Sequence, residues 1–201
     1  MSSSVASRFN NTEVEMDVSA AARAIKRGEI VGVPTDTVYG IAADPFDEVA
    51  LERLYALKGR ESKKPIAILV ASLEQGLLLG AMSDRALDLA ERHWPGPVTL
   101  VVPRLDTAPT WLGDGAKRTV GLRCPDHPVA LALLEMTGPL AVTSANTSED
   151  EPAQTASDAR SVFGNEILTY LDGVAGGGSP STLVDLTHPA ETVLRTGPVS
   201  F

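Results

Sequence analysis

Positively charged side chains gather in one short segment of this chain. Lys58, Arg60, Lys63 and Lys64 lie close together in a protein whose formal net charge is −9. A local reversal of sign in an acidic protein is typical of a site that binds an anion. Lysine offers a point charge and arginine a planar fork of donors, so Lys58 and Arg60 together suit phosphate oxygens. The alternative is structural, because cations near a helix C-terminus also complement the helix dipole.

Short polar side chains follow two predicted strands. Thr35-Asp36-Thr37 comes after the apolar run Ile30–Val33, which Pro34 ends because proline has no N–H to give to a sheet. Ser144-Ala145-Asn146 follows the run Leu140–Thr143 in the same way. Ligands of open α/β sheets bind at the carboxyl ends of strands, so both segments are candidate binding loops. Both are also ordinary turn sequences, because Ser, Thr, Asp and Asn bond to nearby backbone groups.

Two arginines stand at the ends of predicted strands. Arg123 ends the strand Thr119–Arg123, and Arg195 follows the strand Thr192–Leu194. A guanidinium group can hold a carboxylate or a phosphate with two parallel hydrogen bonds. On the pattern alone, each could equally be a surface arginine at the end of a strand.

The elements that must position these residues alternate between helix and strand. Asp47 is a predicted N-cap, and Val49, Leu51, Leu54, Tyr55 and Leu57 form the predicted buried face of its helix. Further helices are predicted over residues 20–27, from 72, 83–93, 128–137 and 155–164. Strands are predicted over residues 30–33, 65–71, 98–102, 119–123, 140–143, 167–171, 183–186 and 192–194. This alternation predicts a single α/β domain, with a twisted mixed sheet flanked by helices.

Three segments lie outside this pattern. Residues 1–16 are polar and aperiodic, without the apolar core of a secretory signal, and are predicted to be a flexible tail before a domain over 17–201. Residues 104–118 are the least periodic internal stretch and could form a mobile flap over a site. Gly176-Gly177-Gly178 is predicted to be a flexible turn.

Composition excludes several classes of protein. The acidic balance argues against broad nucleic-acid binding, which requires a basic surface. One cysteine, Cys124, rules out a disulfide within the chain and indicates a reducing compartment, so we expect a cytoplasmic protein. The three histidines share no metal-ligand spacing, and no apolar run approaches the roughly 20 residues of a membrane span. The chain has neither the P-loop motif G-x-x-x-x-G-K-[ST] nor the dinucleotide-binding motif G-x-G-x-x-G after a strand.

Several segments, taken in order, resemble the YrdC-like family. They are PTDTVYG at 34–40, KGR at 58–60, TVGLRCPDHP at 119–128, SAN at 144–146, STLVD at 181–185 and LRTG at 194–197. The resemblance covers roughly residues 17 to 198, and the pairing of K-x-R with S-x-N is its most specific part. It implies the YrdC-like fold with a concave basic site, in the short form that lacks a second C-terminal domain.

The resemblance also implies roles for individual residues. Lys58, Arg60, Ser144 and Asn146 would be catalytic. ATP would be bound by Lys58, Arg60, Lys64, Thr119, Ser144, Asn146 and Arg195. L-threonine would be bound by Thr35, Arg123 and Ser181, with Arg123 on its carboxylate, and no residue would bind a metal directly. The chain departs from the family at Glu149-Asp150-Glu151, where acids follow the S-A-N motif, and we expect these acids to face solvent.

The family's best-known activity is synthesis of threonylcarbamoyl-AMP. The implied enzyme is a nucleotidyltransferase, L-threonylcarbamoyladenylate synthase, which joins L-threonine, bicarbonate and ATP and releases pyrophosphate, with magnesium accompanying ATP. Its product would pass to a separate tRNA threonylcarbamoyltransferase. The alternative is a non-catalytic RNA-binding relative that holds tRNA or double-stranded RNA, although the acidic balance and the complete pair of motifs weigh against it. A carbamoyltransferase-type module is a third possibility, and it would require partner domains.

Overall fold

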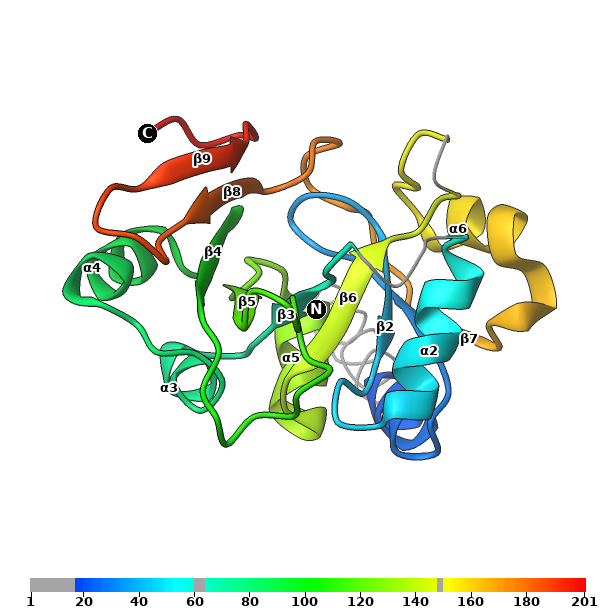
Figure 1. Cartoon of the computed structure of the whole chain (residues 1–201). Helices are drawn as coiled ribbons and strands as arrows, with labels where there is room; N and C mark the ends of the chain where they lie inside the picture. The colour runs from blue at the N-terminus through cyan, green and yellow to red at the C-terminus, as the bar shows by residue number, and fades with distance from the viewer. Residues whose placement is uncertain (1–16, 60–63, 148–149) are drawn as a thin grey trace, which may run out of the picture.

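One mixed β-sheet runs through the residues that the structure describes, which are 17–59, 64–147 and 150–201 of the computed structural model (Figure 1). Its strands are β1 (Val31–Val33), β2 (Gly40–Ala43), β3 (Ala67–Leu69), β4 (Val98–Pro103), β5 (Thr119–Arg123), β6 (Leu140–Ser144), β7 (Thr169–Tyr170), β8 (Thr182–Asp185) and β9 (Thr192–Arg195). Their order across the sheet is β7-β1-β2-β6-β3-β5-β4-β8-β9. The pairs β1–β7, β3–β5 and β4–β8 are parallel and the others antiparallel. The predicted α/β fold with a mixed sheet is confirmed.

Helices connect the strands and cover both faces of the sheet. Residues 17–26 are helical, and the later helices are α2 (Glu48–Leu57), α3 (Leu73–Leu77), α4 (Asp84–His93), α5 (Pro128–Thr137), α6 (Ala156–Phe163) and the 3₁₀ turn η1 (Gly164–Glu166). Asp47 caps α2 by accepting hydrogen bonds from the N–H groups of Val49 and Ala50. Thr155 and Asp158 form the predicted capping box of α6. Such caps satisfy N–H groups that a helix start leaves open, typically worth ~1 kcal/mol each.

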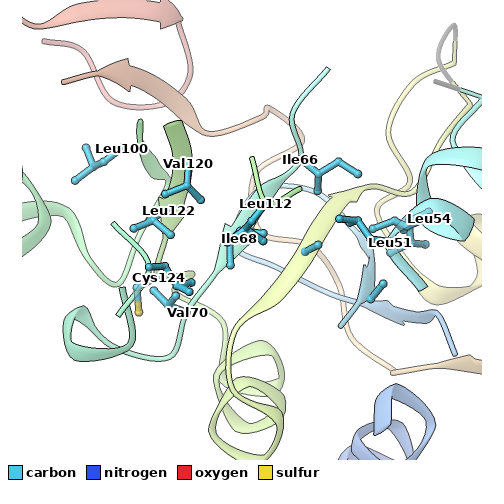
Figure 2. Packing of buried hydrophobic residues seen from close by; sticks show 14 of the residues in the cluster. Leu51, Leu54, Ile66, Ile68, Val70, Leu100, Leu112, Val120, Leu122 and Cys124 are labelled. Atoms are coloured by element: carbon cyan, nitrogen blue, oxygen red, sulfur yellow. The ribbon is translucent and has the colours of Figure 1, made fainter. Parts of the chain in front are cut away.

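Two hydrophobic clusters lie on opposite faces of the sheet. One cluster includes Ile41 and Ile68 and takes in residues of α2, α4 and α6 (Figure 2). The other includes Val33 and Ala42 and takes in the helix over 17–26 and α5. Since successive strand side chains point to opposite faces, Ile41 and Ala42 belong to different layers. Burying each such aliphatic side chain contributes about 1.5–3 kcal/mol, so the two clusters hold the helices to the sheet.

The second face of the sheet is covered only in part. The helix over 17–26 and α5 pack against β1, β2, β6 and β3. Elsewhere on this face the strands present small side chains, and these residues line a cavity: Gly40, Ala67, Thr99, Thr119, Gly121 and Ser144. Their neighbours along each strand, such as Leu100 and Leu122, point to the opposite layer and are buried. Because successive side chains point to opposite faces, the same strands supply the hydrophobic layer on one face and the cavity wall on the other.

Two sequence-based expectations require correction. Val49 belongs to the predicted buried face of α2, but 57% of it is exposed, because the inward stripe of this helix consists of Ala50, Leu51 and Leu54. Gly176-Gly177-Gly178, predicted to be a flexible turn, donates backbone N–H groups to the carbonyl oxygens of Thr35 and Thr37. The glycine-rich segment is thus bonded to the turn that follows β1.

The segment between β4 and β5, residues 104–118, packs against the body of the protein at its middle. Leu112 is fully buried and lies in the same cluster as Ile68 (Figure 2). The Trp111 Nε1–H donates a hydrogen bond of 3.1 Å to the Pro45 carbonyl oxygen. Arg104 donates to the carbonyl oxygens of Ala108 and Pro109 at 2.9 and 2.6 Å. The middle of this segment is therefore part of the core.

None of the helices in the described ranges has the length and apolar composition needed to cross a bilayer.

Candidate active site

A cavity of about 940 Å³ lies on the partly covered face of the sheet. Seven of the predicted site residues line it, namely Thr35, Thr119, Arg123, Ser144, Asn146, Ser181 and Arg195. They come from segments far apart in the sequence and meet because β5, β4 and β6 lie near the centre of the sheet. The structure therefore places these seven residues around one cavity, and their roles and their contacts to ligands stay predictions.

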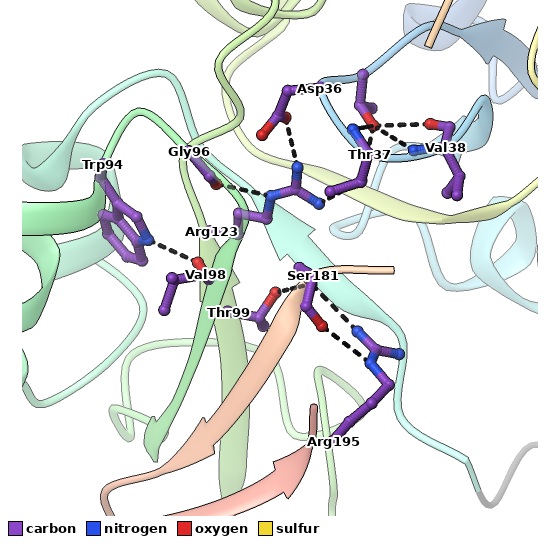
Figure 3. A network of polar contacts seen from close by, with 11 residues as sticks. Asp36, Thr37, Val38, Trp94, Gly96, Val98, Thr99, Arg123, Ser181 and Arg195 are labelled. Atoms are coloured by element: carbon purple, nitrogen blue, oxygen red, sulfur yellow. Dashed lines mark hydrogen bonds and ion pairs between the residues drawn. The ribbon is translucent and has the colours of Figure 1, made fainter. Parts of the chain in front are cut away.

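Arg123 is buried in the cavity wall and held by three groups (Figure 3). Its Nε–H donates to the Gly96 carbonyl oxygen at 3.0 Å, and Nη1 donates to Thr37 Oγ1 at 2.9 Å. Nη2 donates to Asp36 Oδ1 in an ion pair. A guanidinium has five N–H donors, so donors remain for a carboxylate in the cavity beyond these three described contacts. Burial lowers the pKa of Arg123 from its usual value and Asp36 opposes this shift, but an arginine stays protonated.

The turn after β1 places Thr35 and Thr37 beside this arginine. Thr35 Oγ1 donates to the Val38 carbonyl oxygen at 2.7 Å and lies 3.0 Å from Thr37 Oγ1. Both threonines are almost fully buried but line the cavity. The sequence left open whether Thr35 and Thr37 form only a turn or also contribute to a site. In the structure they stabilise the turn and also line the cavity.

The S-A-N loop after β6 is built around Lys58. The Lys58 ammonium donates to the Ser144 carbonyl oxygen at 2.8 Å, to Ser144 Oγ at 3.1 Å and to the Asn146 carbonyl oxygen at 2.6 Å, and it also contacts Asn146 Oδ1. Ser144 Oγ donates to Asn146 Oδ1 at 2.6 Å. Asn146 Nδ2 donates to the Asp150 carbonyl oxygen at 2.6 Å. The loop is thus a closed hydrogen-bonded unit on the cavity wall.

The position of Lys58 differs from its sequence prediction. A solvent-facing position at the end of α2 is expected from the charge run, but only 1% of Lys58 is exposed. Lys58 follows Leu54 by four residues and Leu51 by seven, so it continues the buried stripe of the helix. It lies behind Ser144 and Asn146 and is not among the described residues that line the cavity. Its contact with a nucleotide phosphate stays a prediction.

Ser181 connects two further cavity residues (Figure 3). Its Oγ lies 2.7 Å from Thr99 Oγ1 and accepts a hydrogen bond of 3.1 Å from Arg195 Nη2. Arg195 Nε also donates to the Ser181 carbonyl oxygen at 3.0 Å. Two bonds to one residue fix the direction of the Arg195 guanidinium. The predicted threonine-binding serine and the predicted phosphate-binding arginine are therefore in direct contact.

Among the described residues, Lys58 and Lys64 are the predicted site residues that do not line the cavity. Lys64 is exposed and is not among the described residues that line the cavity. Arg60 and Lys63 lie outside the described residues, as does Glu149. Asp150 was expected to face solvent, and it is exposed but also lines the cavity. The carboxylates of Asp114, Asp150 and Asp185 stand along the wall with the cations Lys117, Arg118, Arg123 and Arg195, so the predicted basic character of the site stays a prediction.

Sequence reasoning missed Asp36, Thr37 and Thr99 as individual contributors. Thr99 lies between the buried Val98 and Leu100, so strand alternation alone predicts that it points away from the core. Asp36 and Thr37 share one predicted turn with Thr35, and no periodic signal separates their roles. Their contacts to Arg123 span more than 80 positions, a pairing that no local pattern reveals.

Comparisons with known proteins agree with this architecture. The Sua5/yciO/yrdC family model, described as telomere recombination, matches residues 23–197. A Mycobacterium tuberculosis protein with a provisional assignment as threonylcarbamoyl-AMP synthase is 46% identical over 186 residues, which are 91% of this chain and 85% of that protein. The threonylcarbamoyl-AMP synthase of Pseudomonas aeruginosa is 37% identical over 168 residues, covering 83% of this chain and 90% of that protein.

Solved structures show the same likeness. The crystal structure of Pyrococcus abyssi Sua5 complexed with L-threonine has a TM-score of 0.86 at 37% identity and covers 91% of this chain, which spans 54% of that protein. Escherichia coli YciO has a TM-score of 0.85 at 23% identity, covering 92% of this chain and 91% of that protein. The second likeness shows the fold alone.

Proposed function

This chain belongs to the Sua5–YciO–YrdC family, and we propose that it is a threonylcarbamoyl-AMP synthase. Relatives that match most of the chain carry this name, and the Pyrococcus abyssi relative has been crystallised with L-threonine. In finer detail, we propose a nucleotidyl transfer in which L-threonine, bicarbonate and ATP give threonylcarbamoyl-AMP and pyrophosphate. The observation that carries the proposal is a single cavity lined by Arg123, Thr35 and the loop residues Ser144 and Asn146.

The Arg123 end suits the amino-acid substrate. A carboxylate that enters the cavity would meet a guanidinium whose direction is fixed by Gly96, Thr37 and Asp36. Because these contacts exist before binding, little side-chain entropy remains to be lost when a carboxylate binds. Thr35 and Thr37 supply hydroxyl groups close to the same point. We therefore assign threonine to this end, with Ser181 as a further contact.

The nucleotide is assigned to the wall formed by the S-A-N loop, Thr119 and Arg195. Lys58 holds Ser144 and Asn146 in place from behind, so its charge lies close to any phosphate on the loop even without a direct contact. Arg195 offers a second fixed cation. Preorganised charges and dipoles of this kind stabilise charge that develops on phosphate oxygens. Arg60 and Lys64 remain proposed nucleotide contacts on the family resemblance.

The proposed chemistry requires two bond-forming steps. The threonine amine combines with bicarbonate, with loss of water, to give a carbamate. A carbamate oxygen then attacks the α-phosphorus of ATP, and pyrophosphate leaves with the electron pair of the broken P–O bond. Cys124 is not suited to act as a nucleophile, because burial raises the pKa of its thiol to about 11. Catalysis would therefore rest on positioning and charge neutralisation by this chain's residues.

Magnesium is proposed to enter with ATP. Among the described residues, no group of three His, Cys, Asp or Glu side chains is placed to hold a metal ion. Mg²⁺ usually keeps several waters and is bound mainly through substrate phosphates. Bound there, the ion would offset negative charge on the phosphates during the displacement. We propose that the product is then consumed by a separate transferase that acts on tRNA.

A pyrophosphate-release assay tests the proposal. The purified chain is incubated with ATP, magnesium and bicarbonate, together with L-threonine, L-serine or no amino acid. We expect release that depends on threonine and on bicarbonate, and little release with serine. Thr35→Val removes a hydroxyl at constant shape and should lower kcat/KM for threonine by about tenfold or more, the scale of one lost hydrogen bond in a buried site. Thr192→Val, at an exposed position on β9, is the matched control and should retain full activity.

Two results would contradict the proposal. Release that is equal with and without threonine would mean that the cavity does not select an amino acid. Absence of release, together with RNA binding that weakens steeply with salt, would favour the RNA-binding alternative.

A further inference from the structure

Thr99 and Ser181 form a pair of buried hydroxyl groups in the cavity wall. Their Oγ atoms lie 2.7 Å apart, and the two residues are only 1% and 5% exposed (Figure 3). The strands β4 and β8 are parallel, and Thr99 is the register partner of Leu183. Ser181 comes two residues before Leu183, so it projects from the same face of the sheet as Thr99. Both residues line the cavity, so the pair belongs to the face that the substrates are proposed to occupy.

The direction of the Thr99 hydroxyl is set by neighbours on both sides. A Cβ added at Gly121 of β5 would lie 3.4 Å from Thr99 Cγ2, so the methyl group of Thr99 faces β5. Its hydroxyl faces Ser181, at the start of β8. The backbone is anchored here as well, because the Thr182 N–H donates to the Pro97 carbonyl oxygen at 2.9 Å. Since a β-branched side chain is stiff at χ1, Thr99 holds its hydroxyl toward Ser181.

Arg195 limits the hydrogen-bond roles that remain for this pair. Its Nη2 donates to Ser181 Oγ at 3.1 Å, and its Nε donates to the Ser181 carbonyl oxygen at 3.0 Å. One of the two hydroxyl groups donates to the other, which leaves a single O–H between them. In the part of the chain that the structure describes, neither hydroxyl has a further hydrogen-bond partner apart from Arg195. Whichever hydroxyl donates, the pair therefore offers one O–H donor to a group in the cavity.

The remaining donor suits an anionic oxygen. Ser181 Oγ accepts from a guanidinium group, and hydrogen bonds in such a chain polarise one another, so the last O–H becomes a stronger donor. The positive charge of Arg195 also favours a carboxylate-type oxygen over the ammonium group of an amino acid. A hydrogen bond to a charged acceptor is stronger than one to a neutral hydroxyl. Two oxygen-bearing groups of the proposed amino-acid substrate fit this description, its carboxylate and the carbamate formed from its amine.

We propose that Thr99 is a specificity-determining residue for the amino-acid substrate, because the Thr99–Ser181 pair presents one O–H donor of fixed direction to a carboxylate or carbamate oxygen. This inference rests on the proposed function, which assigns threonine to Arg123 with Ser181 as a further contact. It makes Ser181 one half of a two-residue donor whose other half is on β4. A merely structural pair, which only stabilises the contact of β4 with β8, would affect stability without changing substrate recognition.

Titration calorimetry with L-threonine in bicarbonate-free buffer tests the contact to the carboxylate. Thr99→Val removes the hydroxyl at nearly constant shape and should raise the Kd for threonine about fivefold or more, the scale of one lost hydrogen bond. Thr99→Ser keeps the hydroxyl and loses only the methyl contact, so its Kd should stay within about threefold of the wild-type value. Thr169→Val, at a half-buried position of β7 on the far edge of the sheet, is the matched control and should leave the Kd unchanged.

Kinetics in bicarbonate separate the carbamate from the carboxylate. If Thr99→Val binds threonine normally without bicarbonate but raises KM for bicarbonate about fivefold or more, the donor serves the carbamate oxygen. In either case KM for ATP should change by less than about twofold. Normal constants for both threonine and bicarbonate in Thr99→Val would overturn the proposal.

L-2-aminobutyrate, which lacks the threonine hydroxyl, tests a competing contact. We expect Thr99→Val to change the Kd for L-2-aminobutyrate and the Kd for L-threonine by the same factor, because the two ligands share the carboxylate. A loss confined to L-threonine would show that the pair binds the side-chain hydroxyl of the substrate, and the assignment to an anionic oxygen would be wrong.

A double-mutant cycle tests whether the two hydroxyl groups act as one unit. Thr99→Val combined with Ser181→Ala should change the affected constant by no more than about twofold beyond the larger single effect, whereas independent groups would give effects that multiply. Chemical denaturation of the same proteins without substrates should also be non-additive. A loss of stability with every substrate constant unchanged would show a merely structural pair. If the wild type bound no threonine and released no pyrophosphate with it, the proposed function would fail, whereas the denaturation cycle would still decide whether the hydroxyl pair exists.

Discussion

Asp36 and Arg123 form an ion pair in which the two side chains are only 13% and 6% exposed. By contrast, the side chains of the surface ion pair Arg85–Glu191 are 47% and 33% exposed. Exposed pairs contribute little to stability, but the loss of one partner from a buried pair leaves an uncompensated charge. The second carboxylate oxygen of Asp36 is buried without a hydrogen-bond partner in the part of the chain that the structure describes. Arg123 is therefore the main group that stabilises this carboxylate.

Removal of Asp36 should destabilise the protein and make its stability depend on threonine. Asp36→Ala leaves Arg123 buried without its counterion and should lower the free energy of unfolding by about 3–5 kcal/mol, with a smaller loss for Asp36→Asn. A threonine carboxylate at Arg123 would then replace the missing anion. We expect the increase in Tm on adding threonine to be larger in Asp36→Asn than in the wild type. An equal increase in the two proteins would mean that threonine does not contact Arg123.

Arg123→Lys separates charge from geometry. Lysine keeps the positive charge but cannot contact Gly96, Thr37 and Asp36 while also presenting a fork to a carboxylate. We expect the Kd for threonine, measured by titration calorimetry, to rise by about 10–100-fold, and the Kd for ATP to change less than about threefold. Equal losses for both ligands would assign Arg123 to the fold or to the nucleotide.

Lys58 should contribute to stability as well as to activity. Its ammonium contacts four oxygen atoms of Ser144 and Asn146, and Lys58→Met removes this donor from all four. The Ser144 carbonyl oxygen still accepts from the Asn146 N–H, and Asn146 Oδ1 still accepts from Ser144 Oγ, but the Asn146 carbonyl oxygen loses its described donor. We expect a loss of about 2–4 kcal/mol in chemical denaturation, because each buried acceptor left open costs about 1–3 kcal/mol and some will relax. Lys26→Ala, at an exposed position, should stay within about 0.5 kcal/mol of the wild type. If Lys58→Met unfolded with the same free energy as the wild type, the S-A-N loop would keep its shape without the Lys58 ammonium.

The sequence predicted most elements because each has local signals. α5 has its predicted bounds, since Pro128 suits the first turn of a helix and Gly138 ends it. Thr155 and Asp158 predicted the start of α6 by their spacing alone. The order of strands across the sheet could not be predicted, because β6 pairs with β2 and β3 through contacts between residues that are far apart in the chain. No local pattern encodes such a pairing.

The site was predicted in part for the same reason. Motif resemblance identified Thr35, Arg123, Ser144 and Asn146, and the fold brings them to one cavity. The burial of Lys58 differs from the prediction because a charge run usually lies on the surface, whereas the spacing of Lys58 from Leu51 and Leu54 places it on the buried stripe of α2. Partners that depend on three-dimensional packing, such as Asp36 for Arg123, became visible only in the structure.

Cys124 should be almost unreactive in the folded protein. It is 3% exposed, and burial, with Asp36 as a lesser contribution, raises the pKa of its thiol to about 11. At pH 8 the thiolate fraction should therefore be about 10²-fold lower than in the unfolded chain, whose thiol has a pKa near 8.5. We expect modification by a thiol reagent to be slower than in denaturant by at least this factor. Rapid labelling of the native protein would show that the end of β5 opens.

Asp150 stands on the cavity wall beside the loop assigned to the nucleotide. Its carbonyl oxygen accepts a hydrogen bond from Asn146 Nδ2, and its carboxylate contacts Thr147 Oγ1. A carboxylate about 4 Å from a phosphate would cost several kcal/mol at an effective dielectric near 20. Because Asp150 is exposed and its carboxylate contacts Thr147, we expect the actual repulsion to be much weaker.

Asp150→Asn should therefore lower KM for ATP modestly, by about two- to fivefold at low ionic strength, with the gain disappearing as salt is added. The backbone bond from Asn146 survives this change, so kcat should stay near the wild-type value. Glu151→Gln, a similar neutralisation at an exposed position that is not among the described lining residues, is the control and should leave KM for ATP unchanged. A large gain in ATP affinity at every salt concentration would place the Asp150 carboxylate against the phosphates. Loss of magnesium-dependent activity would instead make Asp150 a metal ligand, and the assignment of magnesium to the phosphates would be wrong.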